Sequence, residues 1–474
     1  MTLPDDFITS TRRLMGDSLF DTLVCGLEAQ PIVSIRLNGL KCDPEHTAVS
    51  GGGRVVPWCR EGRYLDIRPN FTFDPLLHAG VYYVQEASSM FVSHVVRSVV
   101  DHPVTMLDLC AAPGGKSIAV REALPSGSLL ISNEPIRNRA NILAENLQKQ
   151  GHRDVIVTNN YPRDFRRSGV TFDVVLADVP CSGEGMFRKD DGAVADWSMK
   201  KVEACSQLQR DIVSDIWPCL RPGGYLIYST CTFNSLEDEQ NVEWIVRTLG
   251  ATLIDVSAEK SWNITPALGC DIPAYRFLPG KTEGEGLFMA VLRKNGTAEA
   301  TTVSKPENKK RKERKQFKED IPAIEIPLND SARYVLRRKD DVTRAVPRAW
   351  AAVYDAVSKS LNVLHAGVEL YREKGHNMLP CQSLALSAET DLSRFVCRET
   401  DYATAIAYLR NEAVRLPEDT PRGIVLLTWM GHPLGFVKNL GNRANNLYPT
   451  EWKIKSTHAP QTPEQIIIEP TIGK

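Results

Sequence analysis

The sequence lacks the features that mark secreted and membrane proteins. Its N-terminus, Met1-Thr-Leu-Pro-Asp-Asp, has no apolar core of the kind found in signal peptides. No stretch free of Asp, Glu, Lys and Arg is longer than the one from Gly423 to Val437, which contains Gly, His and Pro. It is shorter than the ~20 apolar residues that a spanning helix needs. We therefore expect no membrane partner and a cytoplasmic protein.

The sequence also lacks a large net charge and closely spaced cysteine pairs. The chain has 57 Lys and Arg against 58 Asp and Glu, so its net charge is -1. Its overall field recruits neither nucleic acid nor membrane, and such a partner needs a local patch. None of the 11 cysteines forms a C-x-x-C pair, which disfavours structural zinc and a disulfide framework and favours a reducing compartment. We predict no metal site.

One stretch departs from an otherwise ordinary globular composition. Residues 305–318 read KPENKKRKERKQFK, with eight basic and two acidic residues. Such a segment cannot bury a core, so it indicates a linker. The alternative is a basic arm that contacts phosphates. The linker separates an N-terminal body, about 1–295, from a C-terminal body, about 320–474.

Short apolar segments alternate with helical ones between residues 104 and 292. This alternation predicts an α/β fold with a parallel sheet covered on both faces. Ligands of such sheets bind at the carboxyl ends of the strands. The predicted strands are 104–110, 128–134, 154–159, 172–178 and 225–231, and the predicted helices are 116–124, 138–150 and 199–217.

Two of the strand ends suggest a nucleoside-containing cofactor. Asp108 to Lys116 follows the first strand and opens a helix, and Gly114 and Gly115 allow close approach of the backbone to a ligand. The alternative is a tight strand–helix turn. The segment is not G-x-G-x-x-G, which disfavours a dinucleotide. Glu134 ends the second strand, where a carboxylate can accept both ribose hydroxyls. S-adenosylmethionine fits this pair.

Two further strand ends carry cysteines. Asp178-Val-Pro-Cys181 follows the fourth strand and Ser229-Thr-Cys231 follows the fifth. Small buried cysteines are common, so either one alone carries little weight. A cytosine ring explains the pair, because its carbon 5 accepts a methyl group only after a thiolate has added to carbon 6. That chemistry needs a thiolate, an acid and a base, and Cys231, Asp178 and Cys181 supply them. Lys116 is a source of positive field for the thiolate.

These residues resemble the Nop/Sun family of RNA cytosine-5 methyltransferases. The segments D-L-C-A-A-P-G-G-K-S from Asp108, D-V-P-C-S-G-E-G-M-F-R-K from Asp178 and Y-S-T-C-T-F-N-S-L-E-D-E-Q-N from Tyr228 follow the family's order and spacing. Similar segments also occur at residues 34–38, 80–89, 275–279 and 284–290. The resemblance covers about residues 5–295 and implies a Rossmann-like methyltransferase sheet with a small N-terminal α+β RNA-binding domain.

The resemblance implies a role for each matching residue. Cys231 would be the nucleophile, Cys181 would assist product release, and Asp178 would contact the cytosine with Lys116 close by. The family often has an Asp near the adenine after the third strand, and here Asn160 or Tyr161 would take its place. The implied cofactor-binding residues are Cys110, Ala111, Ala112, Pro113, Gly114, Gly115, Lys116, Glu134, Asn160 and Asp178.

The C-terminal body is similar to the bacterial branch called ribosomal small-subunit methyltransferase F. Residues 364–374 resemble its middle α+β domain, and 431–438 followed by Asn445-Asn446-Leu-Tyr-Pro449 resemble its terminal PUA-like β-barrel domain. The implied division is 1–95, 96–295, the linker 296–320, 321–390 and 391–474. We expect a monomer that binds RNA, either small-subunit rRNA or the small ribosomal subunit, and no DNA.

The sequence leaves three alternative functions open. Transfer RNA is the alternative substrate within the same class. A non-catalytic RNA-binding assembly factor would be expected to lose Cys231 or the glycine loop, and both are present. A methyltransferase acting on protein or a small molecule needs no cysteine pair.

Overall fold

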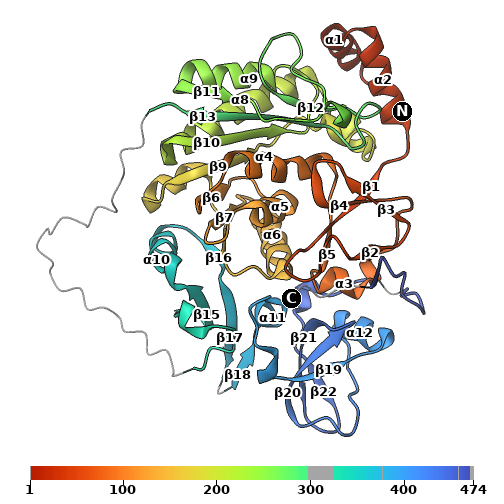
Figure 1. Ribbon diagram of the computed structural model, residues 1–474, viewed down its shortest axis with the longest axis vertical. Coiled ribbons are helices and arrows are strands. Elements are labelled where there is room, and N and C mark those ends of the chain that lie inside the picture. The colour runs from red at the N-terminus through yellow and green to blue at the C-terminus, as the bar shows by residue number, and fades with distance from the viewer. Residues whose placement is uncertain (1, 297–323, 376, 457, 470–474) are drawn as a thin grey trace, which may run out of the picture.

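The computed structural model describes residues 2–296, 324–375, 377–456 and 458–469 (Figure 1). Residues 297–320 of the predicted linker therefore lie outside the described part of the chain. Within it, no helix is long and apolar enough to cross a membrane. The molecule is built around one nine-stranded sheet, with a four-stranded sheet on its N-terminal side and two more formed by the C-terminal half.

The central sheet confirms the predicted α/β architecture. Its five predicted strands lie side by side and parallel, and antiparallel strands close both edges. In spatial order the strands are β11 (Ala251–Ile254), β13 (Leu287–Lys294), β10 (Leu220–Thr230), β9 (Phe172–Asp178), β6 (Thr105–Asp108), β7 (Leu129–Asn133), β8 (Val155–Thr158) and β16 (Val363–Ala366), and β12 (Tyr275–Phe277) pairs with β13.

Helices cover both faces of this sheet, because successive strand residues point to opposite sides. Leu107 packs into one core and Met106 into the other. The first core includes side chains of α8 (Met199–Ile216), α9 (Glu239–Trp244) and α10 (Ala351–Ser360). The opposite face is covered by α4 (Phe91–Val99), α5 (Gly115–Ala123) and α6 (Arg137–Gln150).

The N-terminal sheet attaches to the central sheet through buried polar contacts. Its strands, in order, are β3 (Gly52–Val56), β4 (Cys59–Leu65), β1 (Val33–Leu37) and β5 (Tyr82–Val84). Arg36 on β1 is fully buried and forms an ion pair with Glu122 of α5. Asn38 donates to the carbonyl oxygens of Gly80 and Gln150 at 2.7 and 2.9 Å. These residues therefore join the two domains.

Two N-terminal helices reach the other end of the sheet. The apolar faces of α1 (Asp5–Met15) and α2 (Asp17–Glu28) pack on Phe187, Trp197 and Phe233. These three aromatic residues follow the two predicted cysteines along the chain. The N-terminal helices therefore support the loops that carry Cys181 and Cys231.

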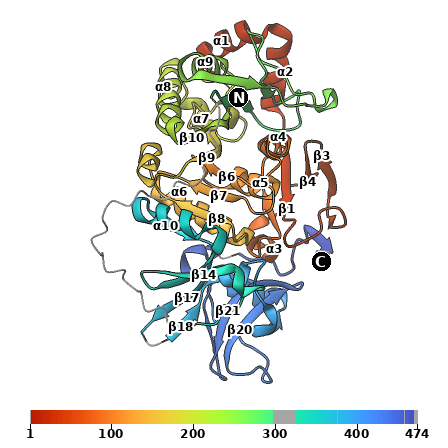
Figure 2. The ribbon, with the colours of Figure 1, turned by 60° about the vertical axis from the view of Figure 1, so that its left-hand side comes forward.

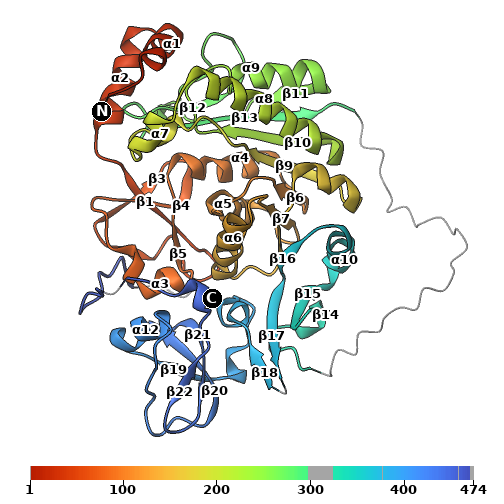
Figure 3. The ribbon, with the colours of Figure 1, turned by 180° about the vertical axis from the view of Figure 1, so that it is seen from behind.

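The middle domain contributes a strand to the central sheet, which the sequence patterns did not predict. Its own sheet contains β14 (Tyr334–Lys339), β15 (Val342–Pro347), β17 (Val368–Lys374) and β18 (Asn377–Pro380). Its strand β16, however, pairs antiparallel with β8, and Figure 3 shows β16 reaching from the middle domain toward the strands of the central sheet. Val357 of α10 is fully buried in the same core as Leu107. The middle domain thus covers an edge that would otherwise expose unpaired backbone groups.

The C-terminal domain lies beside the middle domain, opposite α1 and α2 (Figure 2). It contains β19 (Val396–Glu399), α12 (Tyr402–Leu409), β20 (Gly423–Trp429), β21 (His432–Asn439) and β22 (Ala444–Asn446). It contacts the N-terminal domain, because the Tyr402 hydroxyl donates to the carbonyl oxygen of Phe73. A strand near the end of the chain, β23 (Ile467–Glu469), also pairs with β2 (Ala48–Val49).

Shortening a buried side chain of α10 should test the joint core. Val357→Ala should lower the free energy of unfolding by roughly 1–3 kcal/mol, because it removes two buried methyl groups and leaves a small cavity. Lys359→Ala, on the exposed side of the same helix, should change it by less than about 0.5 kcal/mol. Urea denaturation measures both. Equal effects of the two substitutions would contradict the joint core.

Candidate active site

The glycine loop lies at the carboxyl end of β6 and is held by its neighbours. The hydroxyl of Ser117 donates to Asp108 at 2.6 Å. Arg139 and Asn146 of α6 donate to the carbonyl oxygens of Ala112 and Pro113 at 2.9 and 2.8 Å. The backbone is thereby fixed, while the N–H groups of the first turn of α5 have no partner within the helix. Such groups suit an acceptor-rich ligand.

Two glycines in this loop are required by its shape. Gly114 has φ +120°, a conformation that other residues rarely adopt. A Cβ atom on Gly115 would lie 3.3 Å from the ring of Tyr83. Backbone freedom at the first glycine and a close approach at the second explain the Gly-Gly pair.

Glu134 lies at the carboxyl end of β7, beside the glycine loop. Its side chain is nearly fully buried, and its Oε1 accepts from the N–H of Ile136 at 3.0 Å. Arg139 lies 3.6 Å from Oε2. The carboxylate is therefore held in place at the strand end.

Asn160 lies at the next strand end and is held by the middle domain. Its Oδ1 accepts from the N–H of Asn362, which precedes β16, at 2.9 Å. Its backbone N–H donates to Asn133 at 3.0 Å. The structure thus brings Asn160 to the same edge as Glu134, with one side-chain atom already bonded. Tyr161, the other predicted substitute for the missing Asp, is exposed.

Lys116 and Asp178 form a salt bridge across the strand ends. Lys116 Nζ lies 2.9 Å from Asp178 Oδ2, and the Ser229 hydroxyl donates to Oδ1 at 2.7 Å. Burial alone would lower the pKa of Lys116, but the charge and hydrogen bond of Asp178, together with the charge of Cys231, raise it above its usual value. Lys116 is therefore a cation that interacts with both predicted catalytic groups.

The two predicted cysteines face each other. Cys181 Sγ lies 3.0 Å from Cys231 Sγ, and both are free thiols with partial exposure. The hydrogen bond with Cys231, followed by burial, raises the pKa of Cys181 well above its usual value. Cys181 therefore keeps its proton more readily than a free thiol, and either sulfur can be the donor in this contact. The pair can supply a nucleophilic thiolate beside a thiol that exchanges a proton.

Two buried carboxylates hold the cysteine loops together. Glu237, in the loop after Cys231, accepts from the N–H of Ser182 at 3.0 Å. Glu184, in the loop after Cys181, accepts from the N–H groups of Phe233 and Asn234 at 2.5 and 3.1 Å. Each loop thus provides the carboxylate that binds the backbone of the other. We call this reciprocal arrangement the carboxylate clasp.

The clasp works only with close backbone contact between the loops. Gly185 N donates to the carbonyl oxygen of Cys231 at 2.7 Å, and a Cβ atom on Gly185 would lie 2.8 Å from that oxygen. Burial and the nearby Glu237 raise the pKa of Glu184 to about 7. Glu184, Gly185 and Glu237 were not predicted as site residues, although all three lie within the segments S-G-E-G and N-S-L-E-D-E.

Comparisons with known proteins find the same family along most of the chain. The family model described as 16S rRNA methyltransferase RsmB/F matches residues 99–293. The model of the N-terminal domain of 16S rRNA methyltransferase RsmF matches 3–87, and that of the methyltransferase RsmF PUA domain matches 396–454.

Curated relatives and solved structures agree with these matches. The chain is 28% identical to "Ribosomal RNA small subunit methyltransferase F" of Serratia proteamaculans, covering 95% of this chain and 96% of that protein. It is 29% identical to the protein of that name from Escherichia coli O9:H4, covering 94% and 96%. A methyltransferase homolog protein from Pyrococcus horikoshii superposes with a TM-score of 0.53 and 25% identity, over 61% of this chain and 95% of that one. NSun6 from P. horikoshii gives 0.52 and 21%, over 62% and 99%, and shares the fold.

Glu237→Gln should loosen the clasp. The new amide group turns an N–H donor toward the donors of Ser182 and Gln209, which now bind the carboxylate. Hydrogen exchange of the peptide containing Ser182 should become about 10- to 30-fold faster, the equivalent of about 1.4–2 kcal/mol. Glu243→Gln, which removes a partly exposed ion pair with Arg247, should leave that exchange unchanged. Unchanged exchange in Glu237→Gln would rule out the clasp.

Proposed function

This chain belongs to the RsmB/F family of 16S rRNA methyltransferases, and we propose that it methylates carbon 5 of a cytosine in small-subunit rRNA with Cys231 as the nucleophile. The observation that carries this proposal is the Sγ–Sγ distance of 3.0 Å between Cys181 and Cys231, beside the Lys116–Asp178 pair. DNA cytosine-5 methyltransferases use the Pro-Cys cysteine instead, and the presence of both cysteines favours RNA.

In the first step, the Cys231 thiolate forms a bond to carbon 6 of the cytosine. The electron pair of the C5–C6 double bond forms a C4–C5 double bond, the electron pair of the C4–N3 double bond moves onto ring nitrogen 3, and this nitrogen takes up a proton. Asp178 contacts this nitrogen, and Lys116, which donates to Asp178, supplies the proton through the pair. Carbon 5 becomes enamine-like and takes the methyl group.

The second step releases the product. The hydrogen bond and charge of Cys231 contribute to the raised pKa of Cys181, and the new carbon–sulfur bond removes the charge. Cys181 then gives up its proton to solvent and accepts the proton of carbon 5. The C5–C6 double bond re-forms, the bond from carbon 6 to Cys231 breaks, and nitrogen 3 returns its proton to the Lys116–Asp178 pair.

S-adenosylmethionine supplies the methyl group when it is bound. The residues at the strand ends fit it: Glu134 offers a carboxylate for the ribose hydroxyls, and the loop from Cys110 to Lys116 offers free N–H groups at the start of α5. Asn160 would face the adenine with the amide nitrogen that Asn362 leaves free. Asp178 completes the cofactor-binding set.

We propose that the flanking domains hold the RNA. The N-terminal domain of 1–95 and the C-terminal domains of 321–390 and 391–474 would bind it around the target cytosine, which is flipped out of its stack. The relatives named ribosomal RNA small subunit methyltransferase F support small-subunit rRNA over transfer RNA. We further propose a cytoplasmic monomer.

Cys231→Ala should abolish methylation while folding and cofactor binding survive. Loss of the nucleophile should lower the rate by roughly 10³-fold or more. Bisulfite sequencing of small-subunit rRNA from cells that carry only this variant measures the result, and one protected cytosine should become convertible. Cys25→Ala, an exposed cysteine, serves as the control. Full protection in the Cys231 variant would disprove the mechanism.

Cys181→Ala should trap a covalent protein–RNA adduct, because carbon 5 cannot lose its proton efficiently and Cys231 stays attached. A slow band on a denaturing gel is the expected result, and it should vanish in the double variant with Cys231→Ala. Absence of the band in the single variant would assign product release to another group.

A further inference from the structure

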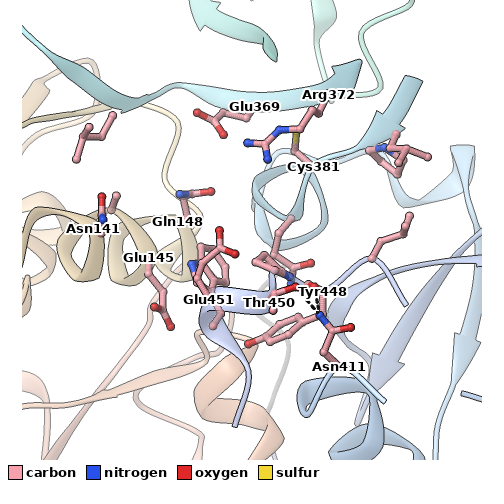
Figure 4. Close-up of a pocket in the computed structure, with 18 of the residues that line it drawn as sticks. Asn141, Glu145, Gln148, Glu369, Arg372, Cys381, Asn411, Tyr448, Thr450 and Glu451 are labelled. Carbon is pink, nitrogen blue, oxygen red and sulfur yellow. Dashed lines mark hydrogen bonds between the residues drawn. The ribbon is translucent and has the colours of Figure 1, made fainter. Parts of the chain in front are cut away.

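A cavity of about 910 Å³ lies where the catalytic, middle and C-terminal domains meet (Figure 4). None of the proposed catalytic or cofactor-binding residues lines it. Its walls are one face of α6, the sheet strands β17 and β18, and the segment from Asn446 to Trp452. The three domains together therefore form a site that none of them forms alone.

The α6 wall connects this cavity to the proposed cofactor site. Arg137, Asn141, Glu145 and Gln148 line the cavity from one helix face, as their spacing of three or four residues requires. Arg137 is the first residue of α6, and Glu134 shortly precedes it. A ligand along this face would lie against the helix that also holds the glycine loop.

The C-terminal wall contains a buried hydroxyl with no partner. Tyr448 is 3% exposed, and its hydroxyl oxygen has no hydrogen-bond partner among the described residues. Its neighbours are satisfied: Asn411 donates to the carbonyl oxygen of Tyr448 and to Thr450, and Asn446 donates to backbone oxygens. Buried polar groups normally have a hydrogen-bond partner, so an unpaired hydroxyl in a cavity wall indicates a ligand that forms a hydrogen bond with it.

The cavity also combines aromatic, amide and cationic groups. The ring centroids of Trp452 and Tyr448 lie 6.3 Å apart, with the rings edge to face. Asn141 and Gln148 offer amide donors and acceptors on the opposite wall. Figure 4 shows Arg372 on β17 facing the helix across the cavity.

The charges on the walls favour an anion near β17. Three carboxylates line the cavity: Glu369 is paired with Arg344, Glu145 is paired with Lys149, and Glu451 lies on the C-terminal segment rather than on β17. Arg372 has only a 3.6 Å contact with Asp341 and is 60% exposed. Lys374 follows on the same strand and lines the same cavity. Two cations of the wall are therefore available to a ligand.

We propose that this cavity binds one unpaired nucleotide. Its base would lie against Tyr448 and Trp452, with its edge bonded by the amides of α6, and its phosphate would contact Arg372 and Lys374. The proposal rests on the proposed function in one respect: the favoured source of the nucleotide is the RNA substrate, held at a second point away from the target cytosine. A free nucleotide presents the same chemistry and is the other source.

Crosslinking of the full-length protein tests the proposal. The probe is a single-stranded oligoribonucleotide with one 4-thiouridine, and irradiated complexes are mapped by peptide mass spectrometry. We expect crosslinks in the peptides that contain Gln148 and Trp452. Arg372→Gln should lower their yield about tenfold. Arg333→Gln should not, although Arg333 has a similar 3.7 Å pair with Asp330 and is 53% exposed.

The substitution Tyr448→Phe distinguishes an effect on nucleotide binding from an effect on folding. Because the hydroxyl has no partner in the described protein, its removal should leave the melting temperature unchanged while the crosslink yield falls at least about threefold. An unchanged yield in both Tyr448→Phe and Arg372→Gln, or crosslinks confined to other surfaces, would overturn the proposal.

Two further experiments identify the source of the nucleotide and distinguish a failure of the cavity proposal from a failure of the proposed function. If nucleoside monophosphates bind this cavity and the oligonucleotide does not crosslink there, the nucleotide site stands and RNA as its source is overturned. The cavity crosslink should persist in Cys231→Ala, because Cys231 does not line the cavity. Normal methylation without the cavity crosslink would overturn only the cavity proposal. An intact crosslink in a wild-type protein that does not methylate RNA would overturn only the proposed function.

Discussion

The chemistry of this protein depends on the carboxylate clasp that holds two loops together. Cys181 and Cys231 follow the ends of the neighbouring parallel strands β9 and β10, and Glu184 and Glu237 hold their loops together because each binds the backbone of the opposite loop. Buried carboxylates so close together repel each other, and burial with this repulsion raises the pKa of Glu184 to about 7. Backbone and side-chain donors offset that cost. The clasp thus holds the thiols at a distance at which one can donate to the other.

Much of the fold could be predicted from periodicity and strand-end motifs. The alternation of apolar strands with helices predicted the parallel strands of the sheet, since strands buried on both faces leave a strong local signal. The contribution of β16 left no such signal, because the pairing of β8 with β16 joins residues far apart in the chain. An edge strand is chosen by tertiary packing, which one sequence does not reveal.

The part of the site that could be predicted is the set of groups to which we assign the chemistry. Cysteines, a carboxylate and a lysine at strand ends can be recognised by residue type and position. Their supports could not be, because Glu184 and Gly185 look like ordinary loop residues until the opposite loop is in place. The cavity around Tyr448 was hidden for the same reason: its walls come from three domains. The Asn446-Leu-Tyr-Pro segment could be recognised only by its resemblance to a PUA-like domain, and in the structure Asn446 donates to the backbone of its own domain.

The most direct test of this account is to find which sulfur attacks the cytosine. RNA substrate in which the target cytosine carries fluorine at carbon 5 cannot lose that substituent as a proton, so the methylated intermediate should stay attached to the protein. Digestion and mass spectrometry then locate the attachment. The account predicts a methylated nucleotide on Cys231. Attachment to Cys181, or no attachment while the enzyme is active on unmodified RNA, would contradict it.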